Sequence, residues 1–177
     1  MNLKPLKTAG LVSLIMGILF AITGAVTWGI ITAQLADERI TTPNDAFLPG
    51  APVNNPLAAL AQADIINKHA LAGSEGKTYA ELGAEAGKAR AAAEEAKKAG
   101  DQAKADEETA KAEEFTKQRT SVMNGSFLRA SLFTSVLAYG VSLFAFGLGL
   151  TLIILGWALN KVGSQAVVTA RDGATRA

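Results

Sequence analysis

Hydrophobic and polar residues are separated along this chain rather than mixed. No charged residue occurs from Thr8 to Ala36 or from Ala130 to Asn160, and these runs are 29 and 31 residues long. A helix needs about 20 mostly apolar residues to cross the hydrocarbon core of a bilayer. The pattern therefore predicts an all-α membrane protein in which residues 9–34 and 131–160 form two transmembrane helices arranged as a hairpin.

The length of the first apolar run distinguishes it from a signal peptide. A cleavable signal has an apolar region of about 7 to 15 residues followed by a small-x-small cleavage site. The run here is longer, and Ala33 and Ala36 near its end do not have that spacing. We therefore expect an uncleaved membrane anchor.

The charged residues that flank the two runs predict their orientation. Short basic flanks stay on the cytoplasmic side of a membrane, whereas long loops cross largely regardless of their charge. The expected topology in the plasma membrane places residues 1–8 and 161–177 in the cytoplasm and residues 37–128 outside. The flanking residues are Lys4 and Lys7 before the first run, and Lys161, Arg171, Asp172 and Arg176 after the second.

The loop between the two runs divides by composition. Residues 37–57 hold four of the five prolines and predict an extended segment, because proline is excluded from helix interiors. Apolar residues near helical spacing predict a short helix over residues 58–71. Residues 78–119, rich in Ala, Glu and Lys, predict a solvated helical hairpin jointed at Gly100. The alternative is a partly disordered segment, since few apolar residues are available to bury.

Residues 71–78, LAGSEGKT, resemble a phosphate-binding P-loop but lack its first glycine. A P-loop follows a strand, whereas this stretch follows a predicted helix. The sequence TYAE from Thr78 to Glu81 is instead a capping box, in which two side chains satisfy amides at a helix start. We therefore expect a turn from Gly73 to Lys77, a helix cap at Thr78 and no nucleotide site.

Small residues recur at helical spacing within both apolar runs. Steps of three and four residues keep one helix face toward a partner, and small residues on that face let two backbones approach closely. The serines of the second run could also hydrogen-bond across the contact. The partner is either the other span or another chain. The predicted packing residues are Gly10, Gly17, Ala21 and Gly24 in the first run and Ser131, Ser135, Ala138, Ser142, Ala145, Gly149 and Gly156 in the second.

Charged residues also lie at the predicted outer ends of the two spans. Asp37 and Glu38 follow the first run, and Arg129 immediately precedes the second. An antiparallel hairpin brings these ends together, so we predict an outer-face ion pair between Arg129 and one of the two carboxylates. The alternative is that Arg129 only anchors the chain to lipid headgroups.

Few residues of this chain are suited to catalysis or metal binding. It has no cysteine, which excludes thiolate chemistry, and His69 is its only histidine. Asp64 lies five residues from His69, off the same helix face. Neither apolar run contains an ionisable residue of the kind that proton relays use. We therefore expect no catalytic residue, no metal site and no cofactor.

Four segments carry a resemblance to a known family: WGIITAQLADERITTPNDAFLPG, ADIINKHAL, GKTYAELG and NGSFLRASLFTSVLAYGV. They resemble small two-span membrane proteins of actinobacteria, whose members are commonly labelled "aromatic ring-opening dioxygenase LigA". The resemblance covers both spans and both ends of the loop, and it implies that residues 85–116 are an insertion. Ring-opening dioxygenases commonly hold iron with two histidines and a carboxylate. One histidine cannot supply that set, so the activity in the label is not expected.

These observations favour a non-catalytic integral membrane protein that is an accessory or scaffold subunit of a larger envelope or respiratory complex. Its expected partners are the lipid bilayer and other membrane protein subunits. One alternative is a homo-oligomer, a passive pore or sensor, with the serines of the second run lining the assembly; an enzyme is a more distant one. Residues 37–129 carry 15 acidic and 12 basic side chains, so no nucleic-acid partner is expected.

Overall fold

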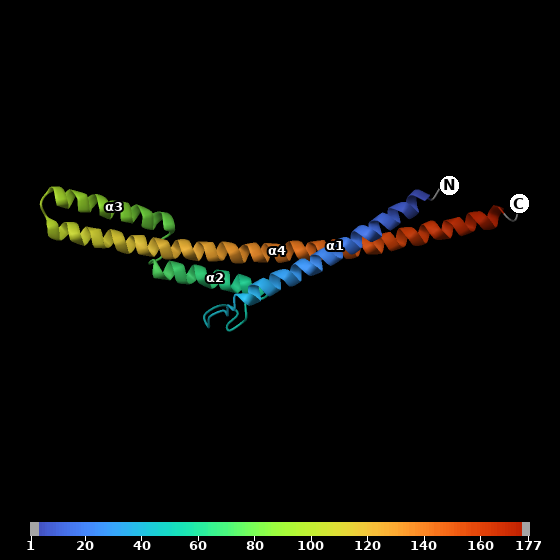
Figure 1. Cartoon of the computed structure of the whole chain (residues 1–177), viewed down its shortest axis with the longest axis horizontal. Coiled ribbons are helices and arrows are strands. Elements are labelled where there is room, and N and C mark those ends of the chain that lie inside the picture. Colours follow the sequence, from blue (N-terminus) through green and yellow to red (C-terminus); the bar gives the residue numbers. More distant parts are fainter. Residues whose placement is uncertain (1–3, 175–177) are drawn as a thin grey trace. The chain divides into compact units, whose positions relative to one another are not determined.

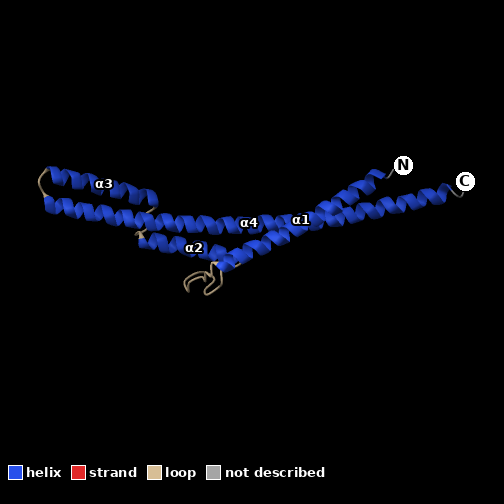
Figure 2. Cartoon of the chain, viewed as in Figure 1, coloured by secondary structure: helices blue, strands red, loops and turns tan. Residues whose placement is uncertain are grey.

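The computed structural model describes residues 4–174 of the chain, with side chains through Ser164. The predicted all-α class is confirmed for this range, which contains four helices and no strand. The helices are α1 (Lys4–Asp37), α2 (Pro56–Gly73), α3 (Tyr79–Lys98) and α4 (Gln102–Ala174); Figure 1 labels them and Figure 2 separates helix from loop. The side chains of Arg171, Asp172 and Arg176, which entered the predicted topology, lie outside the described residues.

Two of these helices are long and apolar enough to cross a membrane, α1 and the Gln102–Ser164 part of α4. Only 17% of the most apolar stretch of either helix is buried within the chain. A core helix of a water-soluble protein hides most of its apolar side chains from solvent. These two helices therefore differ from core helices in how little of their apolar surface the chain itself covers.

The chain folds as two compact units. The first, here the paired-helix unit, consists of α1 and the part of α4 from Leu137 onward. The second, the three-helix unit, spans Arg39–Val136 and contains the proline-rich loop, α2, α3 and the first part of α4.

Local sequence signals set the helix ends in the three-helix unit. The Asn55 side chain accepts hydrogen bonds from two amides of the first turn of α2, and Pro56 suits the first position because no intrahelical partner exists there for its missing amide hydrogen. Thr78 and Glu81 form the capping box at the start of α3, as the sequence TYAE predicts. Gly100 has a φ of 77°, a left-handed conformation that glycine adopts without strain, and it separates α3 from α4.

Most of the buried residues of α3 and of the facing first part of α4 are alanines. Because alanine side chains are short, the two helices approach closely without a large apolar core. Leu82 is fully buried at the start of α3. Gly83 leaves room for the Arg119 guanidinium, which lies 4.0 Å from the centre of the Tyr79 ring. This packing orders a segment that its composition alone left open to disorder. The buried alanines are Ala86, Ala89, Ala93 and Ala96 on α3 and Ala105 and Ala112 on α4.

α4 continues without a break from the hairpin into the second apolar run, although the sequence pattern predicts separate elements at residues 78–119 and 131–160. Gly125 lies inside this helix, where a glycine costs about 1 kcal/mol relative to alanine. A Cβ added at Gly125 would lie 3.2 Å from the Ala70 Cβ and 3.5 Å from the Ile66 Cγ2 of α2. The glycine therefore serves close packing of α2 on α4 rather than a helix end, and no proline follows Pro56 to interrupt α4.

The proline-rich segment between α1 and α2 is a compact loop organised around Thr42, whose side chain is buried. The Thr42 hydroxyl donates to the carbonyl of Leu48 and accepts a hydrogen bond from the Ala51 amide at 2.9 Å. The Val53 amide donates to the carbonyl of Ile40 at 2.9 Å. These bonds satisfy backbone groups that the prolines prevent from joining a helix.

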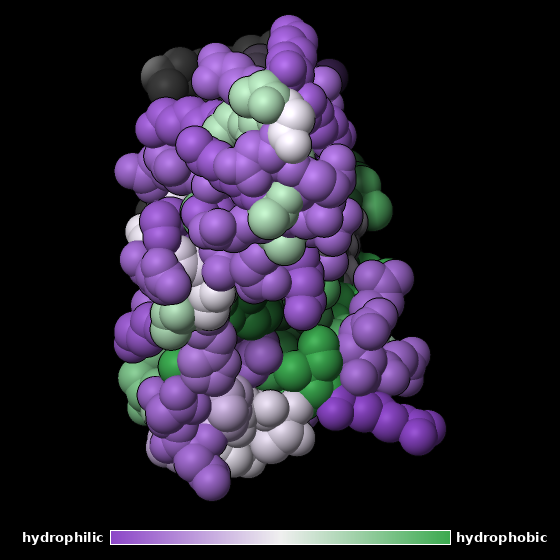
Figure 3. All heavy atoms as spheres, turned by 90° about the vertical axis from the view of Figure 1, so that its left-hand side faces the viewer, coloured by the Kyte–Doolittle hydropathy of each residue, from purple (hydrophilic) through white to green (hydrophobic). Residues whose placement is uncertain are grey.

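The surface of the three-helix unit is polar at the end where α3 turns into α4. Figure 3 looks onto that end, and hydrophilic residues cover most of the face. Neighbouring turns of the helices carry ion pairs between lysine and glutamate, for example Lys97 with Glu94 and Lys111 with Glu107. Such exposed pairs contribute little to stability, but they keep the alanine-rich hairpin well solvated.

Candidate functional site

The closest backbone approach in the paired-helix unit lies between α1 and α4, at what we call the glycine interface. It comprises Gly10, Gly17 and Gly24 on α1 and Gly156, Gly149 and Ser142 on α4. A Cβ added at Gly17 would lie 2.7 Å from the Gly149 carbonyl oxygen, and one added at Gly24 would lie 2.6 Å from the Ser142 carbonyl oxygen. Both values are below any real Cβ contact, so only glycine permits this approach.

The remaining predicted packing residues differ in how deeply they are buried and in which unit they belong to. The backbone nitrogen of Ala21 would lie 2.5 Å from a Cβ added at Gly149, so Ala21 belongs to the glycine interface. Ala138 and Ala145 are half-buried. Ser135 is half-buried and Ser131 is exposed, and both belong to the three-helix unit.

The hydrogen bonds at the glycine interface differ from the expectation that serines of the second run bond across it. Ser142 is 2% exposed, but its hydroxyl donates to the carbonyl of Ala138 in the same helix at 2.8 Å. The carbonyl four residues back lies within reach of a helical serine, so it competes with any acceptor on the other helix. The serine that does cross is Ser13 of α1, whose hydroxyl donates to the carbonyl of Leu152 on α4 at 2.9 Å.

Sequence reasoning missed the aromatic part of this contact. Tyr139 is 1% exposed, its hydroxyl lies 2.8 Å from the hydroxyl of Thr32, and its ring meets the Trp28 ring edge-on with centres 4.6 Å apart. A tyrosine buried in an apolar region needs a partner for its hydroxyl. Two signals in the sequence could have indicated this aromatic contact. One is the need of a buried tyrosine for a hydrogen-bond partner, and the other is the position of Tyr139 three residues before Ser142 on the same helix face.

The glycine interface also extends further toward the N-terminal end of α1 than the predicted residues indicate. A Cβ added at Gly163 would lie 2.9 Å from the Cγ of Lys7. The Lys7 side chain therefore lies directly over the backbone of α4, and its apolar stem covers that backbone.

The predicted outer-face ion pair stays a prediction. Asp37 ends α1 and Glu38 follows it in the paired-helix unit, whereas Arg129 belongs to the three-helix unit. Within its own unit the Arg129 guanidinium lies 5.7 Å from the centre of the Phe133 ring. Its Nε is buried and has no hydrogen-bond partner among the described residues.

His69 forms a side-chain hydrogen bond that the sequence does not reveal. Its Nε2 lies 2.7 Å from the Oδ2 of Asp45, a residue of the proline-rich loop. Asp64 instead pairs with Lys68 one helical turn away, with 2.7 Å between the two charged groups. The hydrogen bond from His69 lowers the pKa of the Asp45 carboxyl below its usual value. The contact connects the loop to α2, and both side chains are more than half exposed.

The stretch LAGSEGKT forms a tight turn that holds its own polar groups. The buried Ser74 hydroxyl donates to backbone carbonyls of the turn, including that of Lys77 at 2.7 Å. Glu75 and Gly76 have φ angles of 55° and 79°. The Lys77 ammonium, which a P-loop would direct to a phosphate, lies 2.6 Å from the Glu75 carboxylate and lowers the pKa of that carboxyl. The turn and the helix cap at Thr78 agree with the prediction from TYAE.

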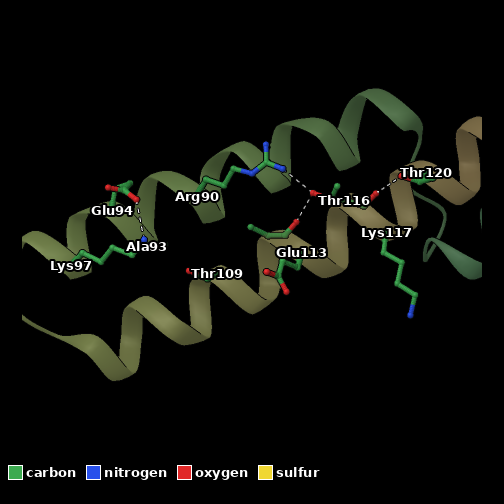
Figure 4. A pocket seen from close by; sticks show the side chains of 10 residues that line it. Arg90, Ala93, Glu94, Lys97, Thr109, Glu113, Thr116, Lys117 and Thr120 are labelled. Carbon is green, nitrogen blue, oxygen red and sulfur yellow. Dashed lines mark hydrogen bonds and ion pairs between the residues drawn. The ribbon is translucent and has the colours of Figure 1, made fainter.

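A groove of about 690 Å³ lies between α3 and α4 (Figure 4). It contains both signs of charge, and several of its side chains already bond one another. Arg90 donates to the Thr116 hydroxyl at 3.0 Å, and Lys97 lies 3.2 Å from the Glu94 carboxylate. Its alanine and threonine floor and mixed charges suit contact with a polar protein surface better than the enclosure of a small molecule.

No protein-family model, no curated protein and no solved structure matches this chain. The resemblance to two-span actinobacterial membrane proteins therefore stays an expectation from the sequence segments that carry it.

Proposed function

We propose that this chain is a non-catalytic integral membrane protein that serves as an accessory or scaffold subunit of a larger envelope or respiratory membrane complex. The observation that carries the proposal is the apolar surface of the paired-helix unit. α1 and α4 contact each other mainly through small residues, apart from the contact of Trp28 with Tyr139, so most of their large side chains point outward. Phe144 is 70% exposed and Leu137 is 69% exposed.

Lipid is the environment that such a surface requires. Exposed apolar patches larger than a few hundred Å² on a soluble protein cause association or aggregation. In a bilayer the same side chains contact acyl chains, and helix association depends on close backbone contact instead. The glycine interface supplies that contact, which supports a two-helix membrane hairpin. The proposed orientation, with both ends of the chain in the cytoplasm and residues 37–128 outside, rests on the basic residues that flank the two apolar runs.

A second face of α4 supports association with a further helix. Gly140 and Gly147 lie two residues before Ser142 and Gly149, which places them about 200° around the helix from the glycine interface. A Cβ added at either glycine meets nothing within 4 Å. Two exposed glycines on one helix face permit close approach by another membrane helix, either from a partner subunit or from a second copy.

The second candidate is therefore a self-assembling homo-oligomer. Its copies would contact one another through Gly140 and Gly147 rather than enclose a pore lined by the serines. Ser142 is buried within the chain, so a lumen lined by the serine stripe would require α1 to move away. Oligomerisation through Gly140 and Gly147 needs no such change. This candidate also leaves the groove between α3 and α4 available.

Two measurements test the proposal. Alkaline carbonate extraction of native membranes is expected to leave the chain in the membrane pellet. Affinity purification of the tagged full chain in mild detergent, read by native gel and mass spectrometry, is expected to recover a stoichiometric partner. Release by alkali, or recovery of a monomer alone, would contradict the subunit proposal. A single self-assembled species that Gly147→Ile dissociates would establish the homo-oligomer instead.

A further inference from the structure

A second groove, of about 830 Å³, runs along α1 in the paired-helix unit. It begins at Lys4 and Thr8 near the start of the helix and continues past Val12, Met16 and Phe20, and Leu152 of α4 forms part of its wall. The groove is therefore cationic at one end and apolar along the rest of its length. The glycine interface and the proposed association face of α4 are separate from it.

The length of this groove matches one leaflet of a bilayer. The distance along α1 from Lys4 to Phe20 is roughly 24 Å at the helical rise of about 1.5 Å per residue. One leaflet with its headgroups is roughly 20–22 Å thick, which is half of a complete bilayer. A phospholipid whose headgroup lies beside Lys4 would place its acyl chain along the apolar part of the groove.

The charge at the polar end favours an anionic headgroup. The glycine interface runs antiparallel, so Lys161 of α4 lies at the same end of the unit as Lys4 and Lys7. A zwitterionic lipid gains less from three ammonium groups than a lipid with net negative charge, because its own cation opposes them.

The walls of the groove favour a flexible acyl chain over a protein helix. Membrane helices that pack closely use small residues, as α1 and α4 do at the glycine interface. Among the described residues, the lining of this groove contains no glycine, and its apolar part consists mainly of branched, long or aromatic side chains such as Val12, Met16 and Phe20. An acyl chain can follow the irregular surface between such side chains because its bonds rotate freely.

We propose that this groove is a binding site for an anionic phospholipid. The headgroup phosphate lies beside the Lys4 ammonium, and one acyl chain follows Val12, Met16 and Phe20 toward the middle of the bilayer. This inference rests on the proposed function, because it requires that α1 crosses a membrane. It adds a specific lipid partner to a hairpin otherwise surrounded by bulk lipid.

Photo-crosslinking of the full chain in vesicles tests the position of the lipid. The vesicles contain equal amounts of phosphatidylglycerol and phosphatidylcholine, and one of the two lipids carries a diazirine on its acyl chain in each experiment. Labelled phosphatidylglycerol is expected to attach mainly between Val12 and Phe20, and labelled phosphatidylcholine to attach there less. Adducts spread evenly over exposed side chains such as Leu143 and Ile154, or equal labelling by both lipids, would overturn the proposal.

Two charge variants test the role of Lys4. Lys4→Gln is expected to lower the preference for phosphatidylglycerol at the groove about fivefold, which is the contribution of one lysine near an anionic surface. Lys161→Gln removes the same charge at the same end of the unit but outside the groove lining, and is expected to lower that preference less than Lys4→Gln does. An equal decrease in both variants would mean that only diffuse surface charge attracts the lipid, and the site would be refuted.

Alkaline extraction of the same vesicles distinguishes this inference from the proposed function. If alkali releases the chain, the proposed function fails and the lipid site fails with it. If the chain resists extraction while the labelling is diffuse, the hairpin crosses the bilayer and only the lipid site is wrong.

Discussion

Replacement of Gly149 by alanine is the sharpest test of the glycine interface. The added Cβ would lie 2.5 Å from the Ala21 backbone nitrogen and 2.7 Å from the Gly17 carbonyl oxygen, whereas ordinary contacts begin at 3.4 Å. Both neighbours are backbone atoms of α1 and cannot rotate away as a side chain would. The two helices must therefore separate by roughly 1 Å at this point, which forfeits a quarter to a half of each local dispersion contact.

The expected cost follows from this geometry. Overpacking of this kind destabilises a folded protein by about 1–3 kcal/mol. The matched control is Gly147→Ala on the same helix, where an added Cβ meets nothing within 4 Å. That variant is expected to be neutral or to gain up to about 1 kcal/mol, because alanine favours helix over glycine.

The assay is unfolding of the detergent-solubilised chain by increasing dodecyl sulfate. Fluorescence of Trp28 reports the transition, because its ring packs against Tyr139 across the contact between α1 and α4. Gly149→Ala is expected to shift the midpoint to lower dodecyl sulfate and Gly147→Ala to leave it unchanged or raise it. Equal midpoints for the two variants would refute the interface.

Three further predictions concern the three-helix unit. Gly125→Leu is expected to destabilise it by about 1–3 kcal/mol through a clash with α2, whereas Gly87→Ala, with open space around it, is expected to raise the thermal midpoint measured by circular dichroism. Thr78→Ala is expected to cost about 1 kcal/mol and to speed amide exchange in the first turn of α3; unchanged exchange would contradict the cap. The carboxyl carbon of Asp45 is expected to titrate with a pKa below the ordinary value of 3.8 and to return toward it in His69→Ala. Because the folded-state pKa is the lower one, this pair stabilises the loop above the pKa of an unfolded aspartate and loses that effect as the pH falls through the folded value.

Much of the helical architecture follows from local chemistry that the sequence displays. The turn at LAGSEGKT, the capping box at Thr78 and the joint at Gly100 depend on residues within a few positions of one another. The continuity of α4 does not follow from local chemistry, because a glycine such as Gly125 can mark the end of a helix or permit close packing within one. The contact of Gly125 with Ala70 and Ile66 of α2 shows that this glycine permits packing, and those two residues lie far earlier in the chain.

The candidate site likewise contains contacts that neighbouring residues do not determine. The hydrogen bond between His69 and Asp45 joins residues 24 positions apart through a loop whose path the prolines restrict but do not define. Tyr139 and Thr32 are 107 positions apart. No spacing rule connects such pairs, so only the folded chain identifies them.

The sequence by itself determined that this protein contains two apolar helices of membrane-spanning length joined by a polar, helical segment, because uninterrupted apolar runs and helix propensity act locally. It also indicated that small residues mediate packing. The predicted packing residues include Ser142 and Gly149, but small residues at the same seven-residue spacing also occur on a second face of α4, so the spacing alone did not require that choice. Ser142 and Gly149 lie on one face, and Gly140 and Gly147 lie on the other.

Only the tertiary structure shows which of these two faces α1 covers. The backbone of α1 lies against Ser142 and Gly149 and leaves Gly140 and Gly147 open. The physical reason is that close packing depends on where the partner backbone lies, and a helix with small residues on two faces carries the same local signal on both.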